Sequence, residues 1–100
     1  MNFTTHVNAS GTWLQGTLVA DYAKLVRAFG APERGDYDKS DANWCLRFDD
    51  GTLATIYNWK DGRAYCGENG TPTDQITEWH IGGDKERAVD YVNAILGRTA

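Results

Sequence analysis

Residues 43–59, with the sequence NWCLRFDDGTLATIYNW, are the stretch that decides the fold. Strand-forming residues flank Asp49-Asp50-Gly51, and an Asp-Gly turn between two such runs is a strong signal for a β-hairpin. Apolar and polar residues alternate before the turn, as they do in a strand with one buried face. The return run is rich in threonine, isoleucine and aromatic residues, which suit a pleated surface. The sequence therefore predicts an antiparallel hairpin at the centre of the domain.

Two registers of this hairpin are compatible with the turn. A two-residue loop pairs Phe48 with Leu53, whereas a three-residue loop with Gly51 in a left-handed bulge position pairs Phe48 with Thr52. A slip of one residue would turn the whole apolar set to solvent. We favour the three-residue loop, because it puts on one face the side chains of Trp44, Leu46, Phe48, Ala54 and Ile56.

Two amphipathic segments predict helices. Residues 22–29 place apolar side chains at i, i+3, i+4 and i+7, with Asp21 as the N-cap and Gly30 just past the end. The last helix is predicted over residues 84–97, with Asp84 as its N-cap and an apolar stripe along one side. Each helix must bury its stripe against a sheet face or against the other helix.

The remaining strands are predicted from short apolar runs. Residues 63–66 are expected to return as a third strand of a meander, and residues 76–81 as a fourth strand. Near the N-terminus, residues 3–7 and 12–14 could pair with each other across a turn-rich spacer.

Together these elements predict a single domain of the α+β class over residues 1–100. An extended N-terminal arm, residues 1–16, precedes an α+β core, residues 17–97. The core is expected to be an antiparallel meander sheet of three to four strands, with both helices packed on one face. Its predicted core residues are Leu25, Phe29, Trp44, Leu46, Phe48, Ile56, Val92 and Ile95.

Composition narrows the class of function. The formal net charge of −4 argues against direct binding to DNA or RNA, where a basic patch supplies most of the affinity. Residues 33–50 carry six acids against three bases, so the acidic character is local. No apolar run approaches the ~20 residues that span a bilayer, and the first residues do not resemble a secretory signal.

The sequence predicts neither a metal site nor a catalytic site. Cys45 and Cys66 form no Cys-x-x-Cys pair and are typical of reduced thiols. His6 and His80 lack the closely spaced partner ligands of a zinc site. No spacing selects a cysteine, His80 and an aspartate as a nucleophilic site. We therefore expect a non-enzymatic protein without a cofactor.

Residues 79–85 are the first candidate binding site. A strand that runs through two glycines into a helix start would expose backbone N–H groups at the positive end of a helix dipole, where an anion can bind. The alternative is a plain strand-to-helix turn in which the carboxylate of Asp84 already occupies the anion position. A phosphate or nucleotide site here would use Trp79, His80, Gly82, Gly83, Lys85 and Arg87.

Aromatic residues on the outer face of the hairpin form the second candidate site. If the helices cover one face of the sheet, these rings line the other face, and an open aromatic face marks a binding surface. The N-terminal arm could cover it instead, or a second copy of the chain could, in a homodimer with Trp59 near the centre of the interface. The protein-binding surface is predicted at Asp36, Asp38, Asp41, Tyr57, Trp59 and Tyr65.

Several segments resemble a family of small, mostly uncharacterised bacteriophage-encoded accessory proteins. The likeness covers roughly residues 17–97 and brings no catalytic residues with it. It is carried by Leu25-Val26, Phe29-Gly30-Ala31-Pro32, Trp44, Phe48-Asp49-Asp50-Gly51-Thr52, Thr55-Ile56-Tyr57-Asn58-Trp59-Lys60 and Ile76-Thr77-Glu78-Trp79-His80-Ile81-Gly82-Gly83.

This resemblance implies a function in the cytoplasm of a bacterial host. Small phage proteins of this kind often antagonise host defence, by binding and blocking a host protein or by sequestering a nucleotide second messenger. We expect the first of these functions, keep a nucleotide sponge as the alternative, and place a small enzyme third. The identity of the partner or nucleotide does not follow from the resemblance.

Overall fold

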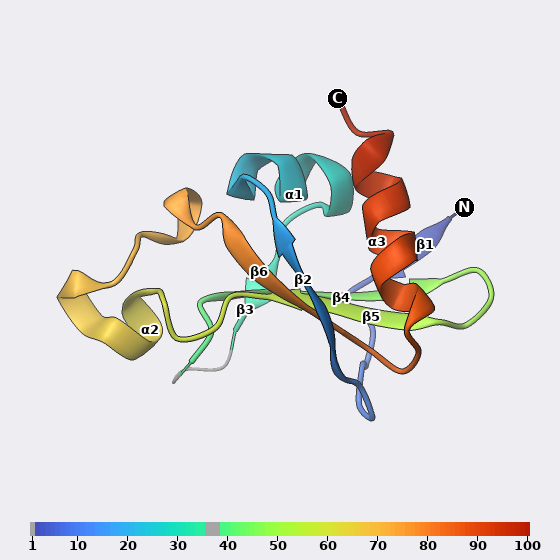
Figure 1. Ribbon diagram of the computed structural model, residues 1–100, viewed down its shortest axis with the longest axis horizontal. Helices are drawn as coiled ribbons and strands as arrows, with labels where there is room; N and C mark the ends of the chain where they lie inside the picture. The colour runs from blue at the N-terminus through green and yellow to red at the C-terminus, as the bar shows by residue number, and fades with distance from the viewer. Residues whose placement is uncertain (1, 36–38) are drawn as a thin grey trace.

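The computed structural model describes residues 2–35 and 39–100. Within them, six strands form one antiparallel sheet in the order β1-β4-β5-β6-β2, with β3 also beside β4 (Figure 1). The strands are β1 (Phe3–Thr5), β2 (Trp13–Val19), β3 (Glu33–Arg34), β4 (Ala42–Phe48), β5 (Leu53–Tyr57) and β6 (Glu78–Gly83). The helices are α1 (Tyr22–Phe29), α2 (Arg63–Cys66) and α3 (Arg87–Gly97), with 3₁₀ turns at Gly67–Asn69 and Thr73–Gln75. The α+β class is confirmed, but the sheet is wider than the three to four strands predicted.

The central hairpin has the predicted three-residue loop. The backbone N–H of Phe48 donates to Thr52 at 2.9 Å, and Gly51 has the left-handed φ of +87°. The register pairs Leu46 with Ala54 and Trp44 with Ile56. All five apolar side chains assigned to one face are therefore buried together, and the prediction is confirmed.

Helices α1 and α3 lie on the same face of the sheet, where they enclose the core (Figure 1). The eight predicted core residues are all buried. At the centre, the rings of Trp44 and Trp79 meet edge to face with centroids 5.5 Å apart, and Tyr22 from α1 lies against both. The indole N–H of Trp44 donates to Gly30 O and that of Trp79 to Ala20 O, so neither buried donor is left unpaired.

The prediction that residues 3–7 pair with residues 12–14 is wrong. Strand β1 pairs with β4, whereas β2 pairs with β6 at the opposite edge of the sheet. The arm therefore extends the sheet at both edges and does not lie across its face. The physical reason is that β4 and β6 are the outer strands of the β4-β5-β6 meander. Each would leave the backbone groups of one edge unpaired, and the arm supplies a partner strand to both.

Two further elements differ from the prediction. Residues 63–66 form the short helix α2 and not a third strand, because the carboxylate of Asp41 binds the backbone N–H of Ala64 and turns the chain away from the sheet. Helix α3 begins at Arg87 and not at Asp84. The carboxylate of Asp84 instead accepts the backbone N–H of Leu53, which fixes it to the central hairpin before the helix starts.

Hydrogen bonds between α3 and the hairpin turn hold the helix on the sheet. The hydroxyl of Tyr91 donates to Asp50 Oδ2 at 2.6 Å, and Arg87 Nη2 lies 3.5 Å from the same oxygen. Hydrogen bonds from Tyr91, and then from Thr52, hold the pKa of Asp50 well below its usual range.

The low pKa of Asp50 predicts how stability changes with acid. A carboxylate whose pKa is lower in the folded chain stabilises the fold above its unfolded pKa, about 4, and this contribution is lost as pH falls further. Changing Tyr91→Phe removes the strongest hydrogen bond to Asp50. We expect the variant to lose less thermal stability than the parent between pH 5 and pH 3, as measured by melting temperatures across that range. Parallel curves for the two proteins would contradict this prediction.

Candidate binding surface

The side chains that point away from the core form an open face of the sheet. Because side chains alternate along a strand, burial of Trp44, Ile56 and Ile81 sends their neighbours to the other side. Helices α1 and α3 both lie on the core side (Figure 1). We use the term open face for the surface made by Thr17, Asn43, Cys45, Thr55, Tyr57 and His80, together with Trp59, which follows β5.

Three rings at one end of this face form an aromatic cluster, defined as Tyr57, Trp59 and His80. The register places Tyr57 directly opposite His80, and their ring centroids are 5.5 Å apart. The ring of Trp59 meets Tyr57 edge to face at 6.1 Å and stacks on His80 at 6.1 Å. Burial raises the pKa of Tyr57, which keeps its hydroxyl protonated near neutral pH. The cluster is thus held by contacts among its own members.

Asn58 fixes the backbone from which Trp59 projects. Its side chain is fully buried, and its Oδ1 accepts the backbone N–H groups of Asp41 at 2.8 Å and Ala42 at 3.1 Å. Its Nδ2 donates to the carboxylates of Asp41 at 2.8 Å and Asp61 at 3.1 Å. One amide therefore ties the start of β4 to the turn after β5, and its neighbour Trp59 is directed outward.

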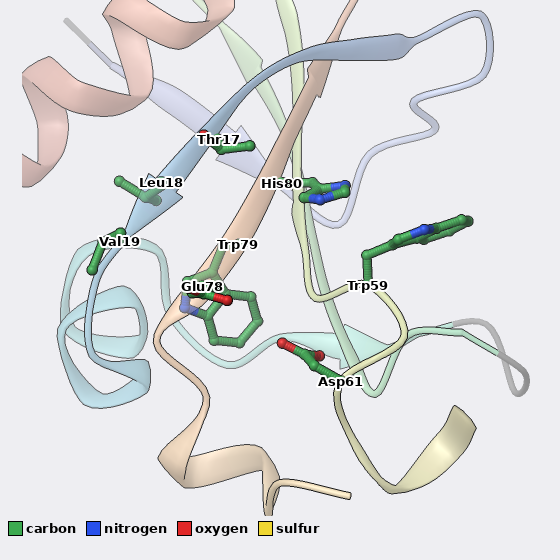
Figure 2. A pocket seen from close by; sticks show the side chains of 8 residues that line it. All are labelled: Thr17, Leu18, Val19, Trp59, Asp61, Glu78, Trp79 and His80. Atoms are coloured by element: carbon green, nitrogen blue, oxygen red, sulfur yellow. The ribbon is translucent and has the colours of Figure 1, made fainter. Parts of the chain in front are cut away.

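Two hollows flank the aromatic cluster, and Trp59 borders both. The first, of about 270 Å³, is called the acidic hollow because it contains the carboxylates of Asp61 and Glu78 beside Trp59 and His80 (Figure 2). Its wall on the side of β2 is made by Thr17, Leu18 and Val19. The second, of about 240 Å³, is called the hydroxyl hollow and is lined by Ser40, Asn43, Thr55, Tyr57 and Trp59.

Two lysines add positive charge around Trp59. Lys39 Nζ lies 5.5 Å and Lys60 Nζ 5.8 Å from the centroid of the indole, within the range of a cation–π contact. Lys60 Nζ also lies 5.4 Å from the ring of Tyr65. The surface around Trp59 therefore combines rings, two ammonium groups and the carboxylates of the acidic hollow.

The residues predicted for the protein-binding surface are only partly together. Tyr57 and Trp59 belong to the aromatic cluster, and Tyr65 is exposed on α2, near Lys60. Asp41 is occupied by internal hydrogen bonds to Asn58 and Ala64. The other two predicted members, Asp36 and Asp38, lie outside the described residues.

The residues predicted for a phosphate site do not share one surface. Trp79 points into the core, whereas His80 points to the open face. Lys85 Nζ lies 3.2 Å from the carboxylate of Asp84, and Arg87 binds Asp50 and Thr52. The remaining two, Gly82 and Gly83, are buried inside β6 and do not form the turn into α3.

Close packing accounts for the two buried glycines. A Cβ on Gly82 would lie 2.4 Å from Thr55 Oγ1, and a Cβ on Gly83 would lie 2.6 Å from the Cβ of Ala88 in α3. Both distances are shorter than van der Waals contact allows. These glycines thus let neighbouring strands and α3 approach β6 closely.

Cys45 does not have the surroundings of a reactive thiol. Burial raises the pKa of the Cys45 thiol, and the nearby Glu33 carboxylate adds to the rise, so the thiol is protonated near neutral pH. A catalytic cysteine needs the opposite shift. The Sγ of Cys66 instead donates to Lys60 O at 3.3 Å. In residues 2–35 and 39–100, no three His, Cys, Asp or Glu side chains are grouped so that they could hold a metal ion.

Sequence reasoning found two of the three rings in the aromatic cluster but missed their partners. His80 was assigned to the phosphate site, and the strand pairing that sets it against Tyr57 was the missing step. Asn58 was not singled out, although a polar residue between Tyr57 and Trp59 in an alternating strand points inward and therefore needs partners. No helix in the described part of the chain has the length and apolar character that crossing a bilayer requires.

The open face therefore carries rings and charges of both signs around Trp59. Its rings contact one another, and its two hollows are shallow spaces on either side of Trp59. The sequence matches no protein-family model and no curated protein.

Proposed function

We propose that this chain is a non-enzymatic binding protein whose aromatic cluster anchors another protein on the open face of the sheet. The supporting observation is the position of Trp59, which is 40% exposed although it contacts two other rings and borders two hollows. Tryptophan and tyrosine are enriched among the residues that supply most of the energy of protein interfaces. Charges of both signs around a ring of this kind favour a specific partner.

The size of the hollows favours a protein over a small molecule. Pockets for drug-sized ligands usually measure about 300–1,000 Å³ and enclose most of the ligand. The acidic hollow and the hydroxyl hollow, at about 270 and 240 Å³, fall just below that range, and Trp59 separates them. Two shallow hollows on either side of a ring can instead accept two side chains of a protein partner.

The alternative, a nucleotide sponge, has one observation in its favour. Lys39 and Lys60 lie beside Trp59, so a base stacked on the indole would have ammonium groups within reach of its phosphates. The carboxylates of Asp61 and Glu78 in the neighbouring hollow oppose such a ligand, because they repel phosphate. Protein binding therefore remains our first proposal.

The resemblance to phage accessory proteins supplies the context of the proposed function. It implies a bacterial host protein as the partner, the host cytoplasm as the place, and blocking of a defence protein as the effect. Asp41 is not a suitable residue for testing this proposal, since it holds the fold together through Asn58 and Ala64. The aromatic cluster is the element to change.

Changing Trp59→Ala should abolish capture of the partner from a bacterial lysate. Trp13→Ala is the matched control, because it removes another exposed indole, which lies in β2 and outside the aromatic cluster. Once mass spectrometry has identified a captured protein, we expect Trp59→Ala to weaken its binding by about 2 kcal/mol or more, the scale of an interface hot spot. Calorimetry on the purified pair measures this loss.

Two outcomes would count against protein binding at this surface. Equal capture by Trp59→Ala and the parent would move the interface away from the aromatic cluster. Release of an intact nucleotide in stoichiometric amount from the denatured pure protein would favour the sponge instead.

A further inference from the structure

Strand β2 forms the long free edge of the sheet. It pairs with β6 on one side, and the described residues place no strand on its other side (Figure 1). We propose that β2 pairs antiparallel with β2 of a second copy of this chain, so that the two sheets join into one. This inference goes beyond the proposed function, and it puts the dimer interface at the sheet edge and not at Trp59.

The backbone of β2 has hydrogen-bonding groups available for such a partner. The N–H of Ala20 donates to Thr77 O at 2.9 Å. Ala20 and Thr77, the residue just before β6 in the same chain, therefore form a hydrogen-bonded pair. In antiparallel sheets such pairs alternate along the strand. The N–H and C=O groups of Thr17 and Val19 therefore point away from β6, out of the edge of the sheet.

The side chains of this strand give it little protection from pairing. Natural sheets usually guard a free edge with lysine, proline or inward-pointing charges. Strand β2 contains no charged residue and no proline. Three of the five large hydrophobic residues found exposed in the described residues lie on it, namely Trp13, Leu14 and Val19, and Val19 is 79% exposed. A β-bulge between Leu14 and Gly16 interrupts the first part, so residues 16–20 are the regular stretch.

The absence of charge on β2 and the lengths of the edge strands favour a second copy of this chain as the partner of β2. The chain carries a net charge of −4, yet residues 12–20 contain no charge, so two copies can meet here without like-charge repulsion. The opposite edge of the sheet offers only the three residues of β1 and the two of β3. Pairing of β2 with that edge would be short and would build an open filament, whereas pairing of β2 with itself closes after two copies.

The free backbone groups define the register. A two-fold axis at Leu18 sets Thr17 opposite Val19 of the second copy, so the outward N–H and C=O groups of these residues bind each other in two hydrogen-bonded pairs. Leu18 then lies opposite Leu18 of the second copy, on the helix side of the sheet. A groove of about 650 Å³ is present there between β2, α1 and α3, lined in part by Leu18, Lys24 and Leu96, and it can take the second leucine.

The dimer would also complete the binding surface. The two-fold axis of an antiparallel pair stands perpendicular to the sheet, so both open faces point the same way. Thr17 and Val19 line the acidic hollow, and the same residues of the second copy would lie next to them. The second copy thus adds a wall to the acidic hollow and sets two aromatic clusters on one continuous face.

Light scattering after size-exclusion chromatography tests the proposal. We expect a mass of twice the 11.1 kDa of one chain. Val19→Pro should give the mass of one chain, because proline removes the outward N–H, which pairing with β6 does not use, and proline is tolerated at such edge positions. Val19→Thr keeps the N–H and should remain a dimer. Trp59→Ala should also remain a dimer, so failure of this proposal and failure of the proposed function are distinguishable.

The proposal is overturned if the parent has the mass of one chain at every concentration, or if folded Val19→Pro is still a dimer. Hydrogen exchange on the unmodified protein gives a second test that does not depend on a variant. The amides of Thr17 and Val19 should be protected at high concentration and should exchange faster on dilution. Fast exchange of both amides in a concentrated sample would overturn the edge pairing as well.

Discussion

Replacing Trp79 by alanine is expected to lower the free energy of unfolding by about 3–5 kcal/mol, the range for emptying a buried tryptophan site. The side chain is only 1% exposed and contacts the rings of Trp44 and Tyr22. The change also removes the donor to Ala20 O, the bond that fixes the chain between β2 and α1. Urea denaturation followed by circular dichroism measures the loss.

Trp59→Ala is the matched control for this experiment. It removes the same side chain from a position that is 40% exposed and lies outside the core, so we expect it to cost clearly less stability than Trp79→Ala. A loss below about 1 kcal/mol for Trp79→Ala would mean that this ring is not part of the core. Trp79 would then become available to a ligand, as the predicted phosphate site requires.

The central hairpin could be predicted from the sequence because its signals are local. The turn residues Asp50 and Gly51 and the alternation around them specify both the loop and the buried face. Helix α1 was predicted with its observed bounds for the same reason, since its apolar spacing and the glycine after it are neighbours in the sequence. Patterns within about ten residues decide such elements.

The N-terminal arm and α2 could not be predicted in this way, because distant residues decide their structure. In the sequence, β1 and β2 resemble the two strands of a hairpin, yet each pairs with a strand more than 40 residues away. Helix α2 follows Lys60-Asp61-Gly62, whose sequence resembles the Asp-Gly turn of the central hairpin, but the carboxylate of Asp41 binds the backbone N–H of Ala64 and redirects the chain. Neither contact leaves a pattern in the local sequence.

The candidate site also has residues that local sequence patterns predict and residues that only contacts between distant segments explain. That Tyr57 and Trp59 face away from the core follows from alternation along one strand, so these rings were found. Gly82 and Gly83 were interpreted as a turn before a helix, since paired glycines usually break a strand. Their actual reason is the close approach of Thr55 and Ala88, a contact between segments that only the folded chain reveals.

Asn58→Ala is the second change from which we expect a large loss of stability. Its buried amide binds two backbone N–H groups and two carboxylates, and alanine would leave all four without this partner. Each buried polar group left unpaired costs about 1–3 kcal/mol, and water can reach the partly exposed carboxylates, so we expect a loss of about 2–4 kcal/mol. Because Asn58 also orients Trp59, the variant should lose stacking between Trp59 and His80, visible as a change in indole fluorescence.

Asn58→Asp tests the same network through its charge. The change keeps an acceptor for the N–H groups of Asp41 and Ala42, but replaces the donating Nδ2 with an oxygen that faces the carboxylates of Asp41 and Asp61. Burial and two like charges raise the pKa of the new carboxyl in the folded chain above its unfolded value of about 4. A raised pKa of this kind destabilises the fold at neutral pH and does so less as pH falls, because the protonated carboxyl can donate again. We therefore expect Asn58→Asp to lose more stability than Asn58→Ala at pH 7, and this loss should narrow toward pH 4.5, measured as melting temperatures relative to the parent at each pH.

Asn43→Asp makes the same chemical change on the open face and should show a much smaller difference with pH. An equal pH response in the two variants would mean that the Asn58 amide does not donate to these carboxylates.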